Sequence, residues 1–461
     1  MLFSSNVFLY VYLPVVLALY YLSPRKLKNL TLFVVSLFFY GWGEPVYVLL
    51  MASVIMLDYA CGIWMEACRR REKSAKPVLI FGVIVNLLIL GWFKYAGFLM
   101  DSMKVLVPEL SAVKLPDISL PIGISFYVFQ SMSYIIDVYR DDAPVQKNAV
   151  VFGAYVTLFP QLIAGPIVRY TDVAEQLVSR REKLTDVASG IRMFVIGLAK
   201  KILLANQMGA LWMELQTLPG TLTAWVGIAA YTLQIYFDFS GYSDMARGLG
   251  RMIGFEFLPN FNYPYISESI TDFWRRWHIS LSTWFREYVY IPLGGNRRGT
   301  ARQILNLVIV WSLTGLWHGA SWNFLLWGLY YCLLLSAEKL GLLRLLRRVP
   351  KFLRRGYTLL AVMLGWALFY FEDMATLGLF LRQLFTASAV TAVGMNRILA
   401  YLPLMAVSML AATPAGAVCA EKLKKYAWSQ WVFIGIGAAM LLLCVGTLVS
   451  QSYNPFIYFR F

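Results

Sequence analysis

The chain contains only two histidines, His278 and His318, and both lie in its most polar and aromatic region. Histidine is the side chain whose charge changes near neutral pH. A neutral imidazole suits a general base, which takes the proton from an attacking hydroxyl group. The two histidines are therefore the first candidates for acid–base chemistry.

His278 lies within a segment that repeats aromatic residues at helical spacing, which predicts an amphipathic helix at a membrane interface. The residues expected on one face are Trp274, Trp277, His278, Leu281, Trp284, Phe285 and Tyr288, with Arg275, Arg276, Ser282 and Arg286 off it. Asp272 or Thr271 is expected to cap the helix. Such a helix needs no chemistry to explain it, so the residues alone leave the role of His278 open.

His318 is flanked by two apolar segments, 304–317 and 322–336. We expect these segments to form a hairpin that enters the membrane and returns, with His318 near its turning point. A histidine at membrane depth costs free energy unless it is hydrogen-bonded or lines a cavity, so it is a functional candidate. The small neighbours Gly315, Gly319 and Ala320 would let a substrate or another helix approach closely. A packing histidine with satisfied hydrogen bonds is the alternative.

The elements that must position these residues belong to a membrane protein. The chain is 59% hydrophobic and 14% charged, against roughly 25% charged residues in an average soluble domain. Apolar segments recur from end to end, so we predict an all-α polytopic membrane protein with no soluble domain. The formal charge of +16 comes from short basic connections, which indicates cytoplasmic loops and no nucleic-acid partner.

We expect about eleven or twelve membrane-spanning helices at a typical 20 residues each. The predicted spans are 3–22, 30–42, 46–64, 78–99, 120–138, 191–211, 222–239, 304–317, 322–336, 357–371, 398–418 and 431–449. The first has no cleavage site and reads as a retained span. The basic cluster at Arg69–Arg71 then falls in the cytoplasm, both termini lie outside, and the bacterial inner membrane is the expected location.

Two stretches do not read as simple spans. The segment 150–169 is apolar but interrupted by Pro160 and Pro166, which predicts a re-entrant segment shielded from lipid. Residues 240–302 are too polar to span and are expected to form a half-buried layer. Lys200 and Lys201, inside a predicted span, should face a wet or protein-lined cavity.

We expect one membrane domain over residues 1–461. Its parts are N-terminal helices at 1–140, the re-entrant segment at 150–169, a catalytic core at 240–340 and C-terminal helices at 356–461. No metal or bound cofactor is expected, because the five cysteines form no CxxC pair. Asp238 and Asp244 more naturally cap or orient helices. Gly294-Gly295-Asn296 lacks the pattern of a phosphate-binding loop and predicts a turn.

The sequence resembles the membrane-bound O-acyltransferase family, and specifically its polysaccharide O-acetylating branch. The motifs that carry the resemblance cover nearly the whole chain in the family's order. They are LPIGISFY at 120–127, AGPIVR at 164–169, FDFSGYSD at 237–244, FWRRWH at 273–278, YIPLGGNR at 290–297, GLWHGA at 315–320 and FIYFRF at 456–461. Glu287, where the branch usually has Asp, is a conservative departure.

The resemblance implies a ring of tilted helices in which a cytoplasmic tunnel for the acyl donor meets an outer funnel for the acceptor. The meeting point would be His318, with His278 assisting. It also implies acetyl-coenzyme A as the donor and a polysaccharide as the final acceptor, reached through an outer-face SGNH-type protein. Candidate contacts for the donor are Arg275, Arg276, Arg286, Arg297, Lys200 and Lys201. The developing oxyanion could accept hydrogen bonds from backbone N–H groups or from the side chains of Asn323, Ser321 or a tyrosine, and the sequence does not choose among them.

Three alternatives stay open from the sequence. The basic residues are equally well explained as cytoplasmic anchors of the helices. The same fold also hosts transfer of D-alanine from a carrier protein to teichoic acid. A transporter would share intramembrane charges and broken helices, although the chain shows no internal repeat.

Overall fold

The computed structural model describes residues 1–113, 116, 119–450, 454 and 457, and every regular element in these residues is a helix. The prediction of an all-α protein is confirmed. The chain divides into two compact units, unit 1 with Met1–Ile191 and Ala246–Leu258, and unit 2 with Arg192–Met245 and Pro259–Phe461. The single membrane domain expected from the sequence stays a prediction.

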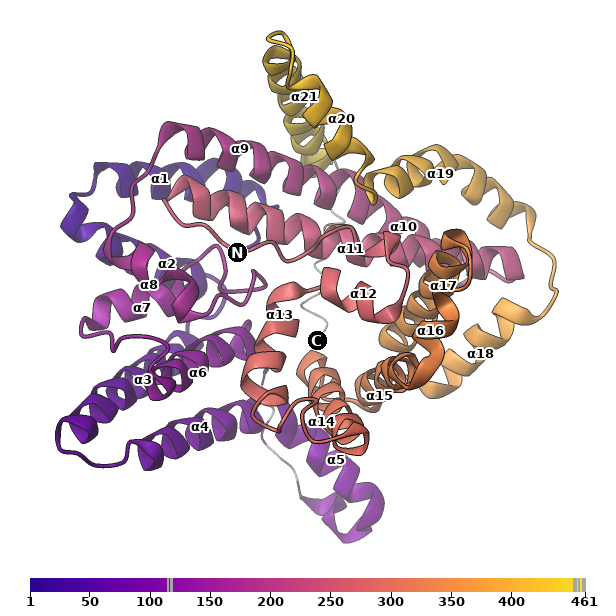
Figure 1. Cartoon of the computed structure of the whole chain (residues 1–461). Coiled ribbons are helices and arrows are strands. Elements are labelled where there is room, and N and C mark those ends of the chain that lie inside the picture. The colour runs from indigo at the N-terminus through magenta and orange to yellow at the C-terminus, as the bar shows by residue number, and fades with distance from the viewer. Residues whose placement is uncertain (114–115, 117–118, 451–453, 455–456, 458–461) are drawn as a thin grey trace. The chain divides into compact units, whose positions relative to one another are not determined.

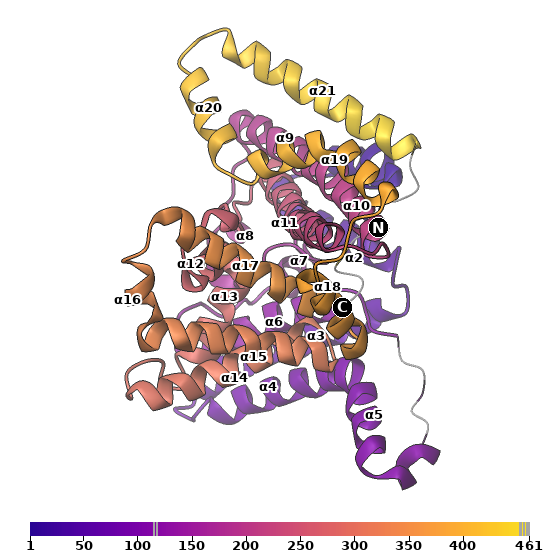
Figure 2. The same ribbon diagram turned by 90° about the vertical axis from the view of Figure 1, so that its right-hand side faces the viewer.

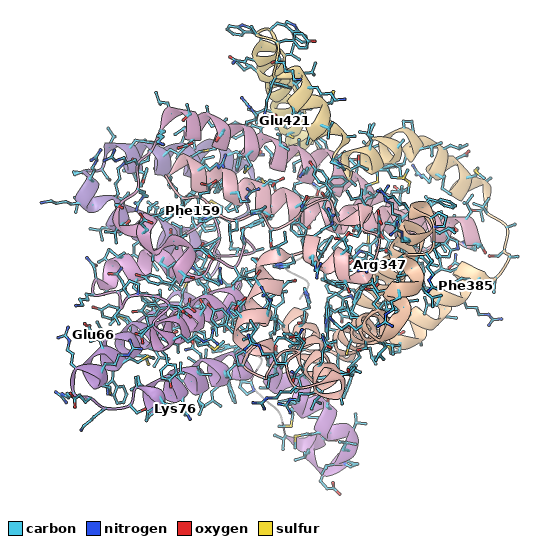
Figure 3. The ribbon with its side chains drawn as sticks, in the orientation of Figure 1. Glu66, Lys76, Phe159, Arg347, Phe385 and Glu421 are labelled. Atoms are coloured by element: carbon cyan, nitrogen blue, oxygen red, sulfur yellow. The ribbon has the colours of Figure 1, made fainter. Side chains whose placement is uncertain are left out.

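Unit 1 is built from the N-terminal helices (Figure 1). They are η1 (Phe8–Tyr12), α1 (Leu13–Leu22), η2 (Arg25–Leu27), α2 (Lys28–Gly41), α3 (Tyr47–Arg70), α4 (Lys76–Leu90), η3 (Gly91–Tyr95), α5 (Ala96–Leu106), η4 (Pro108–Ala112), α6 (Ile124–Arg140), α7 (Ala149–Thr157) and α8 (Tyr170–Val178). Glu66 and Lys76 lie at the connected end of the α3–α4 hairpin (Figure 3). The predicted spans up to residue 138 therefore correspond to helices, with the fourth extended to Leu106.

A buried polar cluster joins three helices of unit 1. Asp58 of α3 accepts hydrogen bonds from Asn86 Nδ2 of α4 at 2.8 Å and from Ser131 Oγ of α6 at 2.5 Å. All three side chains are fully buried. Because buried polar groups are costly unless paired, the cluster fixes the register of these three helices.

The predicted interruption near residue 160 is present. Helix α7 ends at Thr157, and a tight turn follows. A Cβ on Gly165 would lie 2.4 Å from Gln161 Cα, so only glycine fits there. The turn is buried, and the backbone N–H of Phe159 (labelled in Figure 3) donates to Ser36 Oγ at 3.1 Å. The broken backbone is thus shielded by protein, while its entry into a membrane from one side stays a prediction.

Unit 2 carries both histidines. Helices α9 (Leu184–Ala199) and α11 (Thr221–Met252) run through the unit boundaries. The other elements are η5 (Lys200–Ala205), α10 (Asn206–Leu215), η6 (Pro264–Ile266), α12 (Ile270–Arg276), α13 (Ile279–Phe285), η7 (Arg286–Tyr290), α14 (Thr300–His318), α15 (Trp322–Ala337), η8 (Glu338–Leu342), α16 (Leu343–Leu346), α17 (Lys351–Tyr370), α18 (Met374–Phe385), α19 (Ala392–Ala411), α20 (Ala415–Leu423) and α21 (Ser429–Ser450). Helix α11 continues to Met252, beyond the predicted span 222–239, and the point at which this span leaves the membrane stays a prediction.

Helices α14 and α15 form the hairpin expected from the sequence and lie side by side, with α17 next to α15 (Figure 2). Glycines allow the close approach. A Cβ on Gly315 would lie 2.2 Å from Phe324 O, and one on Gly328 would lie 2.2 Å from Trp311 O. The small residues beside His318 therefore admit a helix, which was one of the two possibilities raised by the sequence.

Five helical stretches in the described part of the chain are long and apolar enough to cross a membrane. They are Tyr47–Arg70, Lys76–Leu106, Lys351–Tyr370, Ala392–Ala411 and Ser429–Ser450. Helix α21 buries only Ser429 and Cys444, so its apolar surface faces outward as a lipid-facing helix does. The chain is a multi-pass membrane protein, and the count of eleven or twelve crossings stays a prediction.

Candidate functional site

His278 does not lie within one continuous helix, so the prediction of a single amphipathic helix over its surroundings was wrong. Helix α12 ends at Arg276 and α13 begins at Ile279. His278 itself adopts a left-handed backbone conformation, with φ 45° and ψ 55°. This conformation is uncommon for a residue other than glycine and costs of order 1–3 kcal/mol. The surrounding structure must therefore hold it.

Asn260 holds the backbone that follows His278. The backbone carbonyl of Asn260 accepts the N–H of Ile279 at 3.0 Å. Its side-chain Oδ1 accepts both the N–H and the Oγ–H of Ser280 at 3.0 Å. These bonds satisfy donors at the start of α13 that have no partner within the helix.

The start of α12 is fixed by Ser269 and Glu338. Ser269 Oγ accepts the N–H of Asp272 at 3.0 Å, so Ser269 is the cap and neither Asp272 nor Thr271 is. The buried carboxylate of Glu338 accepts the N–H of Ile270 at 2.7 Å and that of Thr271 at 2.9 Å. A carboxylate at a helix N-terminus is favoured by the helix dipole.

The imidazole of His278 is buried, with 4% of the residue exposed, and does not lie at an interface with solvent. It lies outside the helices that are apolar enough to cross a membrane. Burial lowers the pKa of His278 to about 3, so the ring is neutral near pH 7. Within the part of the chain that the structure describes, its Nδ1 atom has no hydrogen-bond partner.

His318 is the last residue of α14, directly before the turn to α15. This is the turning point of a hairpin, as the sequence predicted. Among the described residues, the rings of three aromatic side chains contact the imidazole, with ring centroids 4.9 Å away for Trp317, 5.0 Å for Trp327 and 5.2 Å for Phe369. Only 7% of His318 is exposed. These aromatic walls shield the imidazole from solvent.

Trp317 brings the two histidines into one site. Its indole meets the ring of His278 edge-on at a centroid distance of 5.9 Å and also contacts His318. Residues 40 positions apart in the sequence therefore share one aromatic neighbour. The sequence offered a signal for this residue only in its place directly before His318.

Asn323 is fully buried and its polar atoms already have protein partners. Its Nδ2 donates to the carbonyl of Phe369 at 3.2 Å, and its Oδ1 accepts from Ser321 Oγ. Phe369 in turn contacts His318. In this arrangement Asn323 positions the aromatic wall of the site.

Lys200 and Lys201 each pair with a carboxylate of α11. Lys200 Nζ lies 2.6 Å from Asp244 Oδ2, and Lys201 Nζ lies 2.6 Å from Asp238 Oδ1. The second pair is almost fully buried, with side chains 4% and 1% exposed. The lysines thus face protein, one of the two surroundings the sequence predicted, and the aspartates are ion-pair partners that sequence reasoning missed.

A close helix crossing creates these ion pairs. A Cβ on Gly197 of α9 would lie 2.5 Å from Gly241 O of α11, and one on Gly241 would lie 2.7 Å from Gly197 O. The helices therefore touch through their backbones, one turn away from the lysines and aspartates. Substituting a larger residue at either glycine would separate the charged partners.

The four candidate arginines differ in their surroundings. Arg276 Nε lies 2.9 Å from Asp272 Oδ1, and Arg286 lies 3.3 Å from Glu287. Arg275 and Arg297 are exposed and have no ion pair to any described residue. Only the latter two present an unneutralised guanidinium to solvent.

The predicted turn at Gly294-Gly295-Asn296 is confirmed. Gly294 and Gly295 have φ values of 104° and 56°, and Asn306 Nδ2 of α14 donates to Gly295 O at 2.8 Å. The terminal FIYFRF motif lies outside the described residues except for Ile457. Among the described residues, no three His, Cys, Asp or Glu side chains gather as a metal site would require.

The sequence is similar to that of membrane-bound O-acyltransferases, including two proteins named for O-acetylation. Residues 141–381 match the family model for membrane-bound O-acyltransferases. The chain is 41% identical to a probable alginate O-acetylase of Azotobacter vinelandii, with the full length of both proteins covered. It is 33% identical to a peptidoglycan O-acetyltransferase of Helicobacter pylori, over 74% of this chain and 70% of that protein.

A more distant relative has a different acyl group in its name. A teichoic acid D-alanyltransferase of Bacillus subtilis is 29% identical over 47% of this chain and 58% of its own length. The O-acetylating relatives are thus both more similar and more completely covered.

Proposed function

Because this chain belongs to the membrane-bound O-acyltransferase family, and is an acyltransferase, we propose that it transfers acetyl groups from cytoplasmic acetyl-coenzyme A for O-acetylation of a polysaccharide outside the cell membrane. The alginate and peptidoglycan O-acetylating relatives support this class of acceptor. The observation that carries the proposal is the pair of buried histidines that share contact with Trp317.

In the proposed reaction His318 is the general base. Its neutral imidazole takes the proton of the acceptor hydroxyl as the hydroxyl oxygen attacks the thioester carbonyl carbon. The tetrahedral intermediate then collapses, the carbon–sulfur bond breaks, and the thiolate of coenzyme A leaves and takes up the proton from His318. The direct acceptor in this scheme is a hydroxyl of an outer-face SGNH-type partner, which passes the acetyl group to the polysaccharide.

His278 assists as a neutral hydrogen-bonding group. With its pKa lowered to about 3 by burial, it carries no charge at the pH at which His318 must accept a proton. A second cation beside His318 would oppose that protonation. The Nδ1 atom of His278 is available to a substrate group or to a water molecule.

Arg275 and Arg297 are the cations proposed to contact the phosphates of the donor. Both are exposed and form an ion pair with no described carboxylate, whereas Lys200 and Lys201 each pair with an aspartate. An arginine fork matches a phosphate group well because it donates two parallel hydrogen bonds.

The acyl donor that the protein accepts distinguishes polysaccharide O-acetylation from transfer of D-alanine to teichoic acid. Purified protein in membrane vesicles, given radiolabelled acetyl-coenzyme A and the SGNH-type partner, should transfer label to the partner and release coenzyme A. A preparation that ignores acetyl-coenzyme A but transfers D-alanine from a loaded carrier protein would overturn the proposal in favour of teichoic acid modification.

A further inference from the structure

A polar cavity in unit 1 is separate from the residues assigned to acyl transfer. Its volume is about 840 Å³, which lies within the range of about 300–1,000 Å³ typical of ligand sites. The start of α2, the end of α8, residues 179–183 and residues 251–256 contribute to its lining. All of these segments belong to the same compact unit.

Basic side chains outnumber acidic ones in the lining of this cavity. The basic residues are Arg25, Lys28, Arg180, Arg181, Lys183 and Arg251. The acidic residues are Glu175, Glu182, Asp186 and Glu256. Two of these acids pair with two of the bases, because Glu182 lies 2.8 Å from Lys28 and Glu256 lies 2.8 Å from Arg251. Four basic and two acidic side chains of the lining remain outside these two pairs.

Arg180 is held in place by neutral groups. Its Nε donates to Tyr20 Oη at 2.9 Å, and its Nη1 donates to Asn29 Oδ1 at 2.7 Å. The guanidinium also stacks over the ring of Phe255, with its central carbon 4.7 Å from the ring centroid. These contacts orient the side chain without cancelling its charge.

The remaining donor atom of Arg180, Nη2, has no partner in the part of the chain that the structure describes. Among the described residues, Nη2 is buried without a hydrogen-bond acceptor, and no carboxylate pairs with this guanidinium. A buried, unsatisfied and charged donor costs free energy unless a ligand or water satisfies it. Its position in a predominantly basic cavity favours an anion.

Exposed apolar side chains flank the basic lining. Val178, which lines the cavity, is 78% exposed, and Leu184, directly after Lys183, is 88% exposed. Leu22, at the end of the apolar helix Phe8–Leu22, is 84% exposed. Basic residues beside exposed leucines are the combination that meets an anionic headgroup and its acyl chains at a membrane surface.

We propose that this cavity binds the phosphate headgroup of an anionic phospholipid, with Arg180 as the anchoring residue. Arg181 and Lys183, which are both exposed, add charge at its edge. The apolar side chains of Leu22, Val178 and Leu184 contact the acyl chains. This site is independent of the proposed acetyl transfer, since none of its residues belongs to the histidine site.

The test compares lipids by their effect on thermal unfolding of the detergent-solubilised full-length protein. Phosphatidylglycerol should raise the unfolding midpoint of the wild type, whereas phosphatidylcholine and inorganic phosphate should not. Arg180→Gln should weaken the apparent affinity for phosphatidylglycerol at least about tenfold. The double variant Arg181→Gln, Lys183→Gln should weaken the same affinity by about fivefold for each charge removed. Arg71→Gln, at an exposed position outside the cavity, is the matched control and should bind as the wild type does.

Three results would overturn the proposal. Equal midpoint shifts with phosphatidylcholine would show that headgroup charge is irrelevant. A full shift with inorganic phosphate alone would identify a soluble anion as the occupant. If Arg180→Gln proves unstable, the double variant decides, because its side chains are exposed, and unchanged affinity in that variant would refute the assigned site.

Discussion

The buried ion pair between Lys201 and Asp238 permits a quantitative test of how unit 2 is held together. Their side chains are 4% and 1% exposed, and the charged atoms lie 2.6 Å apart. Asp238 also accepts the backbone N–H of Ile457 through its other oxygen at 3.0 Å. Removing one partner leaves a charge in a medium that cannot solvate it, which costs about 3–5 kcal/mol.

The two single variants and their combination separate charge from packing. Lys201→Met removes the ammonium, and Asp238→Asn removes the carboxylate charge but keeps an oxygen for Ile457. Each should lower the free energy of unfolding by about 3–5 kcal/mol. The double variant leaves no unpaired charge, so it should recover at least half of the summed loss of the two single variants, which corresponds to a coupling free energy of at least about 3 kcal/mol.

The assay is denaturant unfolding in mixed micelles, followed by tryptophan fluorescence. Arg70→Met is the matched control, because Arg70 pairs with Glu66 at 2.7 Å with side chains 67% and 26% exposed. Such an exposed pair contributes only about 0.3–0.5 kcal/mol. Losses below about 1 kcal/mol for both single variants, or strictly additive effects in the double, would refute the reasoning.

Three further predictions follow from other contacts. Gly315→Ala should lower the free energy of unfolding by about 1–3 kcal/mol, because its Cβ would meet Phe324 O at 2.2 Å. The control Gly356→Ala places its Cβ where no atom lies within 4 Å, so it should be neutral or raise the free energy of unfolding by up to about 1 kcal/mol. Equal thermal stabilities of the two variants would contradict this prediction. The pKa of His278 is about 3 in the folded protein, whereas that of a histidine in the unfolded chain is about 6.5. The unfolded state therefore binds more protons between these two values. As the pH falls from 6.5 towards 3, the free energy of unfolding of the wild type should drop by about 1 kcal/mol per pH unit. Asparagine also tolerates a left-handed backbone, so the free energy of unfolding of His278→Asn should fall less over the same pH range. Identical pH profiles of the two proteins would disprove that His278 is buried in its neutral form. Asn323→Ala should lower kcat with little change in KM, because Asn323 holds Phe369 against His318; a change confined to KM would instead indicate substrate binding.

Local patterns predicted the hairpin that presents His318. Two apolar segments separated by a short turn place the residue before the turn at the end of a helix, and α14 does end at His318. The interruption after α7 was also predictable, because proline cannot continue a helix and glycine permits the tight backbone turn that follows. These features depend on neighbours within a few residues.

The break at His278 was not predictable from periodicity. The aromatic spacing continues across Trp277 and His278 as if the helix did, yet the chain turns there. Asn260, far earlier in the sequence, supplies the bonds that stabilise the new helix start. Helical spacing carries no information about such long-range capping.

The environment of the lysine pair was only half predictable. Charges inside an apolar segment indicate a shielded surrounding, but their partners depend on where α9 and α11 cross. That crossing is set by Gly197 and Gly241. Helix α18 lies between the predicted spans 357–371 and 398–418 and was not predicted, although Asp373 caps its start.

The most direct test of the central claim is the rate of acetyl transfer by His318→Ala in reconstituted vesicles. Coenzyme A release and label transfer are measured with saturating acetyl-coenzyme A, and Gly356→Ala serves as a folded control. Loss of a general base should slow transfer by about 10²–10⁴-fold, while the variant keeps the melting behaviour of a folded protein. A folded His318→Ala protein that transfers acetyl groups at a rate close to that of the wild type would contradict the assignment.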